Sequence, residues 1–511
     1  MKKKFYRFSK MLVIVAVLSA MLMSVISCAS SQYADKAAVE ELIAALENQS
    51  KENSEEMEAL RSELDALKNR LDSIDGRVDF VEDEAFVHQY DFYLTVGTLP
   101  TLYATLNAYN VQNPNTYMWF ERGNTISYEY SADFIHYFPT QSQTNANSSY
   151  NQAVIREKVE EIIKNDSEAK FHLYCDDLRV AYILNIFVRA GVDFENMQVT
   201  FLSDGTATYS DYAGITNDEY ASHAAIWEEH LTKAVNGRTD ASYVYPYNDN
   251  GMGVELRELA YYLSTLSNVE LWVQHPDYLK NDAQSMVDDR DSMKIIKKAP
   301  KELYDSLSSS AKVSYRKAVL ANALVDNDEL NSLEDAVAYF DSQLSGRDKD
   351  TVLILGTSKK TLEENKPYFD ATIEFYTPTV SETDATKVFY KGKTYTITEG
   401  QTSIEVDGKT LNIGELGVYL FFKGHPAHPV NEDVLNYFET NGIVELPRRT
   451  PVEVLFWMYD VKAGGFESTS FLSCYKGQTE FLYEEPKNTA LIQMMDAGFF
   501  DGVQVFKASD L

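Results

Sequence analysis

Short apolar runs alternate with amphipathic segments along most of the chain after residue 86. The runs YDFYLTVG, KFHLYC and MQVTFLSDG have the character of strands, and LPTLYATLNAYN and DDLRVAYILNIFVRAG have the spacing of helices. Alternating strands and helices are typical of a parallel sheet covered by helices. We therefore predict a Rossmann-like domain over residues 86–250, and we assign residues 490–511 to it as a final segment.

A second set of apolar runs begins at KDTVLILGTSKK and continues through ATIEFYTP, VYLFFKGHP, GIVELP and KAGGFES. The stretch between the two sets, from about residue 218 to residue 343, has mainly helical periodicity. Residues 386–412 alternate with a period of two around Gly and Asp-Gly turns, which predicts an inserted β-hairpin. The expected fold class is α/β, with two Rossmann-like domains facing a cleft and the second domain over residues 251–489.

The first residues, MKKKFYRFSKMLVIVAVLSAMLMSVISCAS, place a basic stretch before an apolar run, which is the form of a secretory signal. VISC resembles a bacterial lipobox, which would make residues 1–27 a signal peptide and Cys28 the lipidated amino terminus. We therefore expect a lipoprotein anchored to a membrane of the bacterial cell envelope, facing outside the cytoplasm. The alternative is an uncleaved signal anchor in which the cysteine is incidental.

Residues 28–85 contain an apolar seam with alternating spacings of three and four. Its members are Met57, Leu60, Leu64, Leu67, Leu71, Ile74, Val78 and Val81. Such a heptad pattern predicts a coiled-coil stalk, through which the protein would form a homo-oligomer. The alternative is an amphipathic helix that folds onto the body of the protein.

The charge balance restricts the partners. With 46 Lys and Arg against 78 Asp and Glu, the formal net charge is −32, and no basic stripe is present for a phosphate backbone. This argues against a nucleic-acid partner. Cys175 and Cys474 fall in different predicted domains, so two buried free thiols are expected instead of a disulfide.

Polar residues that could carry chemistry follow the predicted strands. Asp204 follows the run MQVTFLS and precedes Gly205, which permits a sharp turn. Lys423 and His425 come directly after the run LGVYLFF. Because Gly424 and Pro426 end that strand abruptly, we expect both side chains at its carboxyl end. Ligands of open α/β sheets bind at the carboxyl ends of the strands. The alternative for Asp204 is a purely structural role, because Asp-Gly pairs are common in turns that follow strands.

Two further motifs lie late in the second set. In RTPVEVLFW, Thr450 as N-cap, Pro451 at the first helical position and Glu453 predict a capping box. In AGGFESTSFLS, paired glycines allow a close backbone turn, and Ser468 and Thr469 can offer hydroxyls and amides at a helix start, which suits an anion.

In their order and spacing, DG, FKGHP, P-x-E-V-L and GG-x-x-S-[ST] resemble the bacterial sialyltransferases of glycosyltransferase family 80. YLTVGTLPTLYATLNAY is similar to the first strand and helix of that family, and VLILGTS, with Gly356 and Thr357, is similar to its Gly-Thr strand. The resemblance extends from about Asp91 to the carboxyl terminus. It implies a GT-B fold and an inverting transfer, independent of metals and cofactors, from cytidine monophosphate (CMP) sialic acid to a galactoside-type glycan.

The resemblance also implies roles for individual residues. Asp204 resembles the general base that deprotonates the acceptor hydroxyl, and His425 resembles the residue that contacts the donor phosphate and assists the departure of CMP. Glu453 is similar to the glutamate that holds the cytidine ribose. The remaining donor-binding positions of these motifs are Lys423, Gly424, Pro426, Ser468, Thr469, Gly356 and Thr357.

The chain departs from the family mainly on the acceptor side. Ser203 stands where many relatives have a second acidic residue, and Lys359 and Lys360 stand where relatives place an acceptor-stacking tryptophan. The donor-side motifs are better kept, so the acceptor is the least defined part of the expected reaction.

Other functions are compatible with parts of the sequence. His425 and His428 form a His-x-x-His pair, but a catalytic zinc site needs a third ligand. The DDRD motif at Asp288–Asp291 falls in a polar helical stretch typical of a solvated face, so we predict no metal. A degenerate, lipid-anchored glycan-binding protein and a transferase of a related CMP-ulosonic acid remain alternatives.

Overall fold

The computed structural model describes residues 86–121, 125–127, 132–138, 149–176, 180–209, 217–239, 259–260, 262–279, 294–327 and 329–511. The predicted signal peptide, the lipidated Cys28, the coiled coil and the DDRD motif lie outside these residues. Apart from residues 306–313, the described residues belong to one compact unit.

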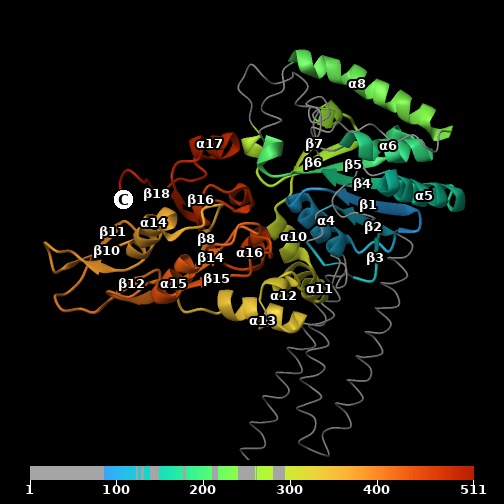
Figure 1. Cartoon of the computed structure of the whole chain (residues 1–511). Coiled ribbons are helices and arrows are strands. Elements are labelled where there is room, and N and C mark those ends of the chain that lie inside the picture. The colour runs from blue at the N-terminus through green and yellow to red at the C-terminus, as the bar shows by residue number, and fades with distance from the viewer. Residues whose placement is uncertain are drawn as a thin grey trace, which may run out of the picture. The chain divides into compact units, whose positions relative to one another are not determined.

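The first part of this unit is built on a parallel sheet with the order β3-β2-β1-β4-β5-β6-β7 (Figure 1). Its strands are β1 (Gln89–Thr95), β2 (Thr116–Phe120), β3 (Ile135–Tyr137), β4 (Lys170–Asp176), β5 (Gln198–Leu202), β6 (Val269–Val273) and β7 (Lys294–Lys297). Its helices are α4 (Thr98–Val111), α5 (Ser149–Asn165), α6 (Val180–Ala190) and α8 (Asn217–Asn236). The order reverses beside β1, which is the kind of switch point at which parallel sheets bind ligands.

Apolar runs form the strands because parallel strands are buried on both faces. Phe92 of β1 and Phe187 of α6 are fully buried and meet edge to face at 5.1 Å. Tyr93 lies on the other face of β1, where it stacks on Tyr174 of β4 at 4.4 Å and accepts a hydrogen bond from Asn107 of α4. The short strands thus need helices on both faces, as the sequence pattern predicted.

The second sheet is also parallel and has the order β15-β14-β8-β16-β17-β18 (Figure 1). Its strands are β8 (Asp350–Leu355), β14 (Val418–Lys423), β15 (Ile443–Glu445), β16 (Lys462–Phe466), β17 (Thr479–Tyr483) and β18 (Gln504–Phe506). The helices with these strands are α14 (Leu362–Phe375), α15 (Glu432–Asn441), α16 (Val452–Met458) and α17 (Thr489–Asp496). Along the chain, four helices separate β7 from β8: α10 (Pro300–Ser306), α11 (Ser309–Leu320), α12 (Ala323–Asp326) and α13 (Leu333–Leu344).

The predicted inserted hairpin is present as two hairpins. Strands β9 (Thr379–Val380), β10 (Lys387–Tyr390) and β11 (Lys393–Thr396) form one small antiparallel sheet, and β12 (Ser403–Val406) pairs with β13 (Lys409–Asn412). The insertion has its own apolar cluster, formed by Val388, Tyr390, Ile397, Ile404 and Leu411.

Three expectations about the layout are wrong. Strands β6 and β7 belong to the first sheet, so that sheet extends beyond residue 250, although the described part of residues 218–343 is otherwise mainly helical, as predicted. Strand β18 pairs with β17, so the last residues add to the second sheet. The run ATIEFYTP was expected to be a strand, but most of it forms the last part of helix α14. A capping box of Thr361 and Glu364 starts this helix, and its buried residues Phe369 and Thr372 keep helical spacing.

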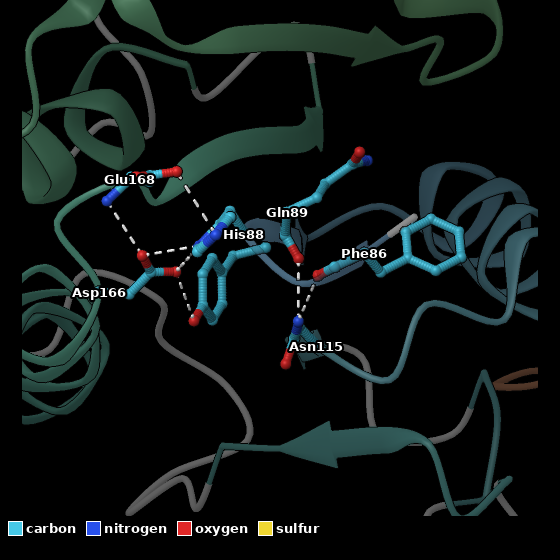
Figure 2. A network of polar contacts seen from close by, with 7 residues as sticks. Phe86, His88, Gln89, Asn115, Asp166 and Glu168 are labelled. Carbon is cyan, nitrogen blue, oxygen red and sulfur yellow. Dashed lines mark hydrogen bonds and ion pairs between the residues drawn. The ribbon is translucent and has the colours of Figure 1, made fainter. Parts of the chain in front are cut away.

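Polar contacts fix the start of the first sheet at its amino-terminal edge. His88, just before β1, contacts Asp166 and Glu168 (Figure 2). Its Nδ1 lies 2.9 Å from Asp166, and its Nε2 lies 3.5 Å from Glu168. Asn115 donates hydrogen bonds to the carbonyl oxygens of Phe86 at 2.9 Å and Gln89 at 3.2 Å. This edge is opposite to the carboxyl ends of the strands.

Within the described residues, none of the helices is both long enough and apolar enough to span a bilayer.

Candidate active site

Asp204 lies at the carboxyl end of the first sheet, two residues after β5. Gly205 follows with a φ of 66°, which is the sharp turn expected from the sequence, and residues 206–209 are helical. The backbone N–H of Asp204 donates to Thr208 Oγ1 at 2.8 Å. The turn therefore holds the carboxylate where β5 ends, partly open to solvent.

Gly97, in the loop after β1, packs directly against this carboxylate. A Cβ atom at Gly97 would lie 2.2 Å from Asp204 Oδ1, so only glycine leaves room for the observed side-chain position. Asp176, the last residue of β4, accepts hydrogen bonds from the N–H groups of Val96 at 2.9 Å and Gly97 at 2.6 Å. This positioning role of Asp176 was not predicted, although an acidic residue at the end of an apolar strand was also the signal that identified Asp204.

Lys423, the last residue of β14, is buried instead of projecting into solvent. Its Nζ donates to the carbonyl oxygens of Arg448 at 2.6 Å and Gly424 at 3.2 Å. Burial lowers the pKa of Lys423 to about 8, against the favourable influence of Glu453, Asp326 and Glu445. The ammonium therefore supplies positive charge from beneath the turn.

His425 is exposed at the tip of the same turn. Its ring stacks on His428 with the centroids 4.7 Å apart. Its Nδ1 accepts a hydrogen bond from the N–H of Ala427 at 3.1 Å, so a neutral His425 carries its proton on Nε2. Burial first, and then the charges of His428 and Lys423, lower the pKa of His425. Strand β14 ends at Lys423, directly before the buried Gly424 and the exposed Pro426, as the sequence predicted.

The capping box predicted at Thr450 is wrong. Helix α16 begins at Val452 with Pro451 as its N-cap, and no side chain caps it. Thr450 is fully buried, and its hydroxyl has no hydrogen-bond partner among the described residues. Glu453 instead accepts a hydrogen bond from the Ser470 hydroxyl at 2.7 Å, because the turn after β16 brings that serine to the start of α16.

The glycine pair ahead of Ser468 is forced by close packing. A Cβ at Gly464 would lie 2.3 Å from the Phe481 ring, and one at Gly465, whose φ is 129°, would lie 2.5 Å from the carbonyl oxygen of Leu355. Ser468 is the N-cap of the 3₁₀ turn η7 (Thr469–Ser473) and accepts from the N–H of Ser470 at 3.2 Å. Thr469 is exposed beside it.

The Gly-Thr motif lies beside β14. The N–H of Gly356, just after β8, donates to the carbonyl oxygen of Lys423 at 3.0 Å, and a Cβ there would lie 2.5 Å from the Phe422 ring. Thr357 accepts from the N–H of Lys359 at 3.4 Å. The motif thus adjoins the turn that carries His425.

Hydrogen bonds also connect the Asp204 turn to η7. Tyr209, at the end of the helical turn after Asp204, accepts from the N–H of His275, which follows β6, at 3.1 Å. His275 Nε2 lies 3.1 Å from the carbonyl oxygen of Leu472 and 2.9 Å from that of Cys474. Burial lowers the pKa of His275 to about 4, so the ring is neutral when it makes these contacts. No sequence pattern indicates this connection, because His275 contacts backbone atoms.

Two further features of the described residues bear on the predictions, namely the cysteines and the possible metal ligands. Cys175 and Cys474 are buried free thiols, as predicted. Within the ranges that the structure describes, no group of three or more His, Cys, Asp and Glu residues is arranged to hold a metal ion.

The comparisons with known proteins address the fold. No protein-family model matches the chain, and no curated protein matches it. An α/β-galactoside α-2,3-sialyltransferase from Photobacterium phosphoreum is similar in structure, with a TM-score of 0.52 at 14% identity, over 83% of this chain and 99% of the other. The GT-B domain of a sialyltransferase from Photobacterium damselae gives a TM-score of 0.52 at 16% identity, over 82% of this chain and 100% of the other.

A further structure of the sialyltransferase from Photobacterium damselae gives a TM-score of 0.51 at 16% identity and covers 82% of this chain and 81% of its own. The resemblance inferred from the four motifs is therefore confirmed for the fold. The chain has the GT-B fold of the bacterial sialyltransferases, with two parallel sheets that each place candidate residues at their carboxyl ends.

Proposed function

We propose that the protein is an inverting, metal-independent sialyltransferase that moves sialic acid from CMP-sialic acid to a galactoside-type glycan. The observation that carries this proposal is that Asp204 follows a strand of one sheet, whereas Lys423 ends a strand of the other sheet and His425 and Ser468 follow strands of it. A transferase of this fold needs a base for the acceptor and cationic or hydrogen-bonding groups for the leaving phosphate.

Asp204 is proposed as the general base. An alcohol is a poor nucleophile at neutral pH, and a carboxylate within hydrogen-bond reach accelerates its attack about 10²- to 10⁴-fold. Asp204 takes the proton as the acceptor oxygen bonds to the anomeric carbon, and the bond from that carbon to the phosphate oxygen breaks. CMP leaves with the electron pair of that bond.

The donor side stabilises the charge that develops on CMP. The buried ammonium of Lys423 and the Nε2–H of His425 supply positive charge and a hydrogen-bond donor, and both act where negative charge increases in the transition state. Ser468 and Thr469 contribute hydroxyls at the start of η7. Glu453, held by Ser470, is proposed to bind the ribose hydroxyls, with Gly356, Thr357, Gly424 and Pro426 shaping the surrounding turns.

The test is to compare transfer and nucleotide binding in the full-length chain. We expect Asp204→Asn to lower kcat about 10²- to 10⁴-fold while calorimetry shows unchanged CMP binding, because the base acts on the acceptor proton alone. We expect His425→Ala to weaken CMP binding and lower turnover together. Asp193→Asn, at the exposed start of the loop that leads into β5, is the matched control and should leave both quantities unchanged.

Two results would reject the proposal. Unchanged turnover in Asp204→Asn would show that Asp204 is not the general base. A wild-type protein that binds no CMP would favour a degenerate glycan-binding protein. Binding of CMP without transfer of sialic acid would favour a related CMP-ulosonic acid as the donor.

A further inference from the structure

Lys359 lies at the carboxyl end of β8, in the loop that also contains Gly356 and Thr357. Its ammonium lies 4.2 Å from the ring centroid of Phe466 and 5.0 Å from that of Tyr368. Phe466 is the last residue of β16 and precedes Glu467 and Ser468. The cation is therefore held over two aromatic rings beside the turn that carries the candidate phosphate-binding hydroxyls.

Aromatic rings hold a cation without neutralising its charge. No carboxylate among the described residues lies within ion-pair distance of Lys359. The acidic residues at this edge have other partners: Glu484 accepts from the Tyr368 hydroxyl and the N–H of Ala508, both at 2.6 Å. Glu467 accepts from the N–H groups of Lys487 and Asn488. Besides the hydrogen bond from Tyr368, which has the largest effect, the charge of Lys359 helps to lower the pKa of Glu484 from a distance. No direct ion pair with a described residue occupies the ammonium, which can therefore contact a bound anion.

The loop around Lys359 is fixed on both sides. The carbonyl oxygen of Lys360 accepts from the N–H of Asn431 at 2.8 Å, and Thr361 and Glu364 form the capping box that starts α14. The rings of Phe466 and Tyr368 are almost completely buried and meet at 73°. A lysine with a fixed backbone and a supported side chain loses less conformational entropy on binding a ligand than a freely solvated lysine does.

We propose that Lys359 is a specificity-determining residue that binds a carboxylate or phosphate group of a bound substrate. This inference rests on the proposed function, which places substrates at the carboxyl ends of these strands. The anion could belong to the sialic acid or phosphate of the donor, or to an acidic sugar of the acceptor. Both sources share the chemistry that an ammonium recognises, and they are separated by the choice of acceptor.

The experiment measures KM values and direct binding for wild type, Lys359→Met, Lys359→Arg and Lys360→Met, all as full-length chains. Lys360→Met removes the same charge from the neighbouring exposed residue, whose ammonium has no aromatic or acidic contact among the described residues, and serves as the matched control. Transfer from CMP-sialic acid is measured with lactose as a neutral acceptor and with 3′-sialyllactose as an acidic one. Calorimetry measures binding of CMP-sialic acid and of 3′-sialyllactose without turnover.

We expect Lys359→Met to raise one KM about 10- to 100-fold, as loss of a hydrogen bond to a charged group does, with Lys359→Arg close to wild type. A raised donor KM with both acceptors assigns the anion to the donor, and a raised KM for 3′-sialyllactose alone assigns it to the acceptor. A raised KM in Lys360→Met of equal size, or unchanged KM and binding in Lys359→Met, would overturn the inference.

Failure of the proposed function has a different signature. A wild-type protein without transfer that still binds 3′-sialyllactose, and binds it more weakly in Lys359→Met, would reject the transferase and retain the anion site. A wild-type protein that binds neither probe would reject both. Equal melting temperatures of wild type and Lys359→Met separate recognition from a merely structural contact between Lys359 and the rings.

Discussion

The two basic residues at the end of β14 differ in burial, but both have a lowered pKa. Lys423 is buried and bonded to two carbonyl oxygens, and its pKa is lowered to about 8. His425 is exposed, its Nδ1 accepts a hydrogen bond from the N–H of Ala427, and its pKa is also lowered. A bound phosphate would favour the protonated form of both side chains, so binding of the donor should raise both pKa values.

Lys423 should make the free energy of unfolding depend on pH. Its folded pKa of about 8 lies below the ordinary value of 10.5, so between these values the unfolded chain binds more protons than the folded one. The unfavourable burial of the charge is then relieved as pH rises. We expect the free energy of unfolding of wild type to rise relative to Lys423→Met by up to about 3 kcal/mol between about pH 8 and pH 10.5.

Urea unfolding of both proteins across this pH range measures the difference, in which the other titrating groups cancel. A difference that falls with increasing pH would contradict the burial of a charged Lys423.

Gly97 should control the position of the proposed base. Gly97→Ala would place a Cβ 2.2 Å from Asp204 Oδ1, so the carboxylate must move. We expect kcat to fall about tenfold or more, because a displacement of about 1 Å strongly impairs a catalytic group, while CMP binding remains unchanged. Initial rates and calorimetry check this prediction. A variant with normal kcat would show that Asp204 does not act from the observed position.

Two helix starts in the second part of the chain share a Thr-x-x-Glu pattern, but only one forms a capping box. Thr361 and Glu364 bond reciprocally at the start of α14. Thr450 and Glu453 do not, since Pro451 takes the N-cap position of α16 and Ser470 holds the carboxylate. A hydroxyl from a distant segment therefore takes the place of the helix N-terminus as the hydrogen-bond partner of Glu453.

Thr450→Val should test this difference between the two helices. The Thr450 hydroxyl is buried without a partner among the described residues, so an apolar group of the same shape should leave the free energy of unfolding unchanged or raise it by up to about 1 kcal/mol. Thr361→Val should instead lower it by about 1 kcal/mol, because that hydroxyl caps α14. Chemical denaturation compares the two variants. A destabilised Thr450→Val would restore a capping role for Thr450.

At the scale of the whole molecule, the proposed site depends on segments that are far apart in the sequence. Asp176 fixes the loop that holds Gly97 against Asp204, and His275 connects the Asp204 turn to η7. The candidate residues of the first and second sheets are therefore connected by hydrogen bonds.

The amino-terminal segment should tether this body to a membrane. The lipobox-like VISC predicts lipidation of Cys28, and stable attachment requires more than one acyl chain. We expect Cys28→Ala to block processing and to change the partition between membrane and soluble fractions. Fractionation of cells that produce each protein, with an immunoblot for precursor size, measures both effects. Identical processing and partition of the variant would contradict the anchor.

The sequence by itself determined the two α/β sets and the turns at Asp204 and His425, because apolar runs and Gly or Pro breaks act over a few residues. It could not place β6 and β7 in the first sheet or β18 in the second, since the strand order depends on contacts between distant segments. It identified Glu453 but assigned it the wrong hydrogen-bond partner, because Ser470 approaches only when β16 and α16 pack together. The aromatic contacts of Lys359 could not be predicted either, since only tertiary packing brings the rings of Phe466 and Tyr368 against its ammonium.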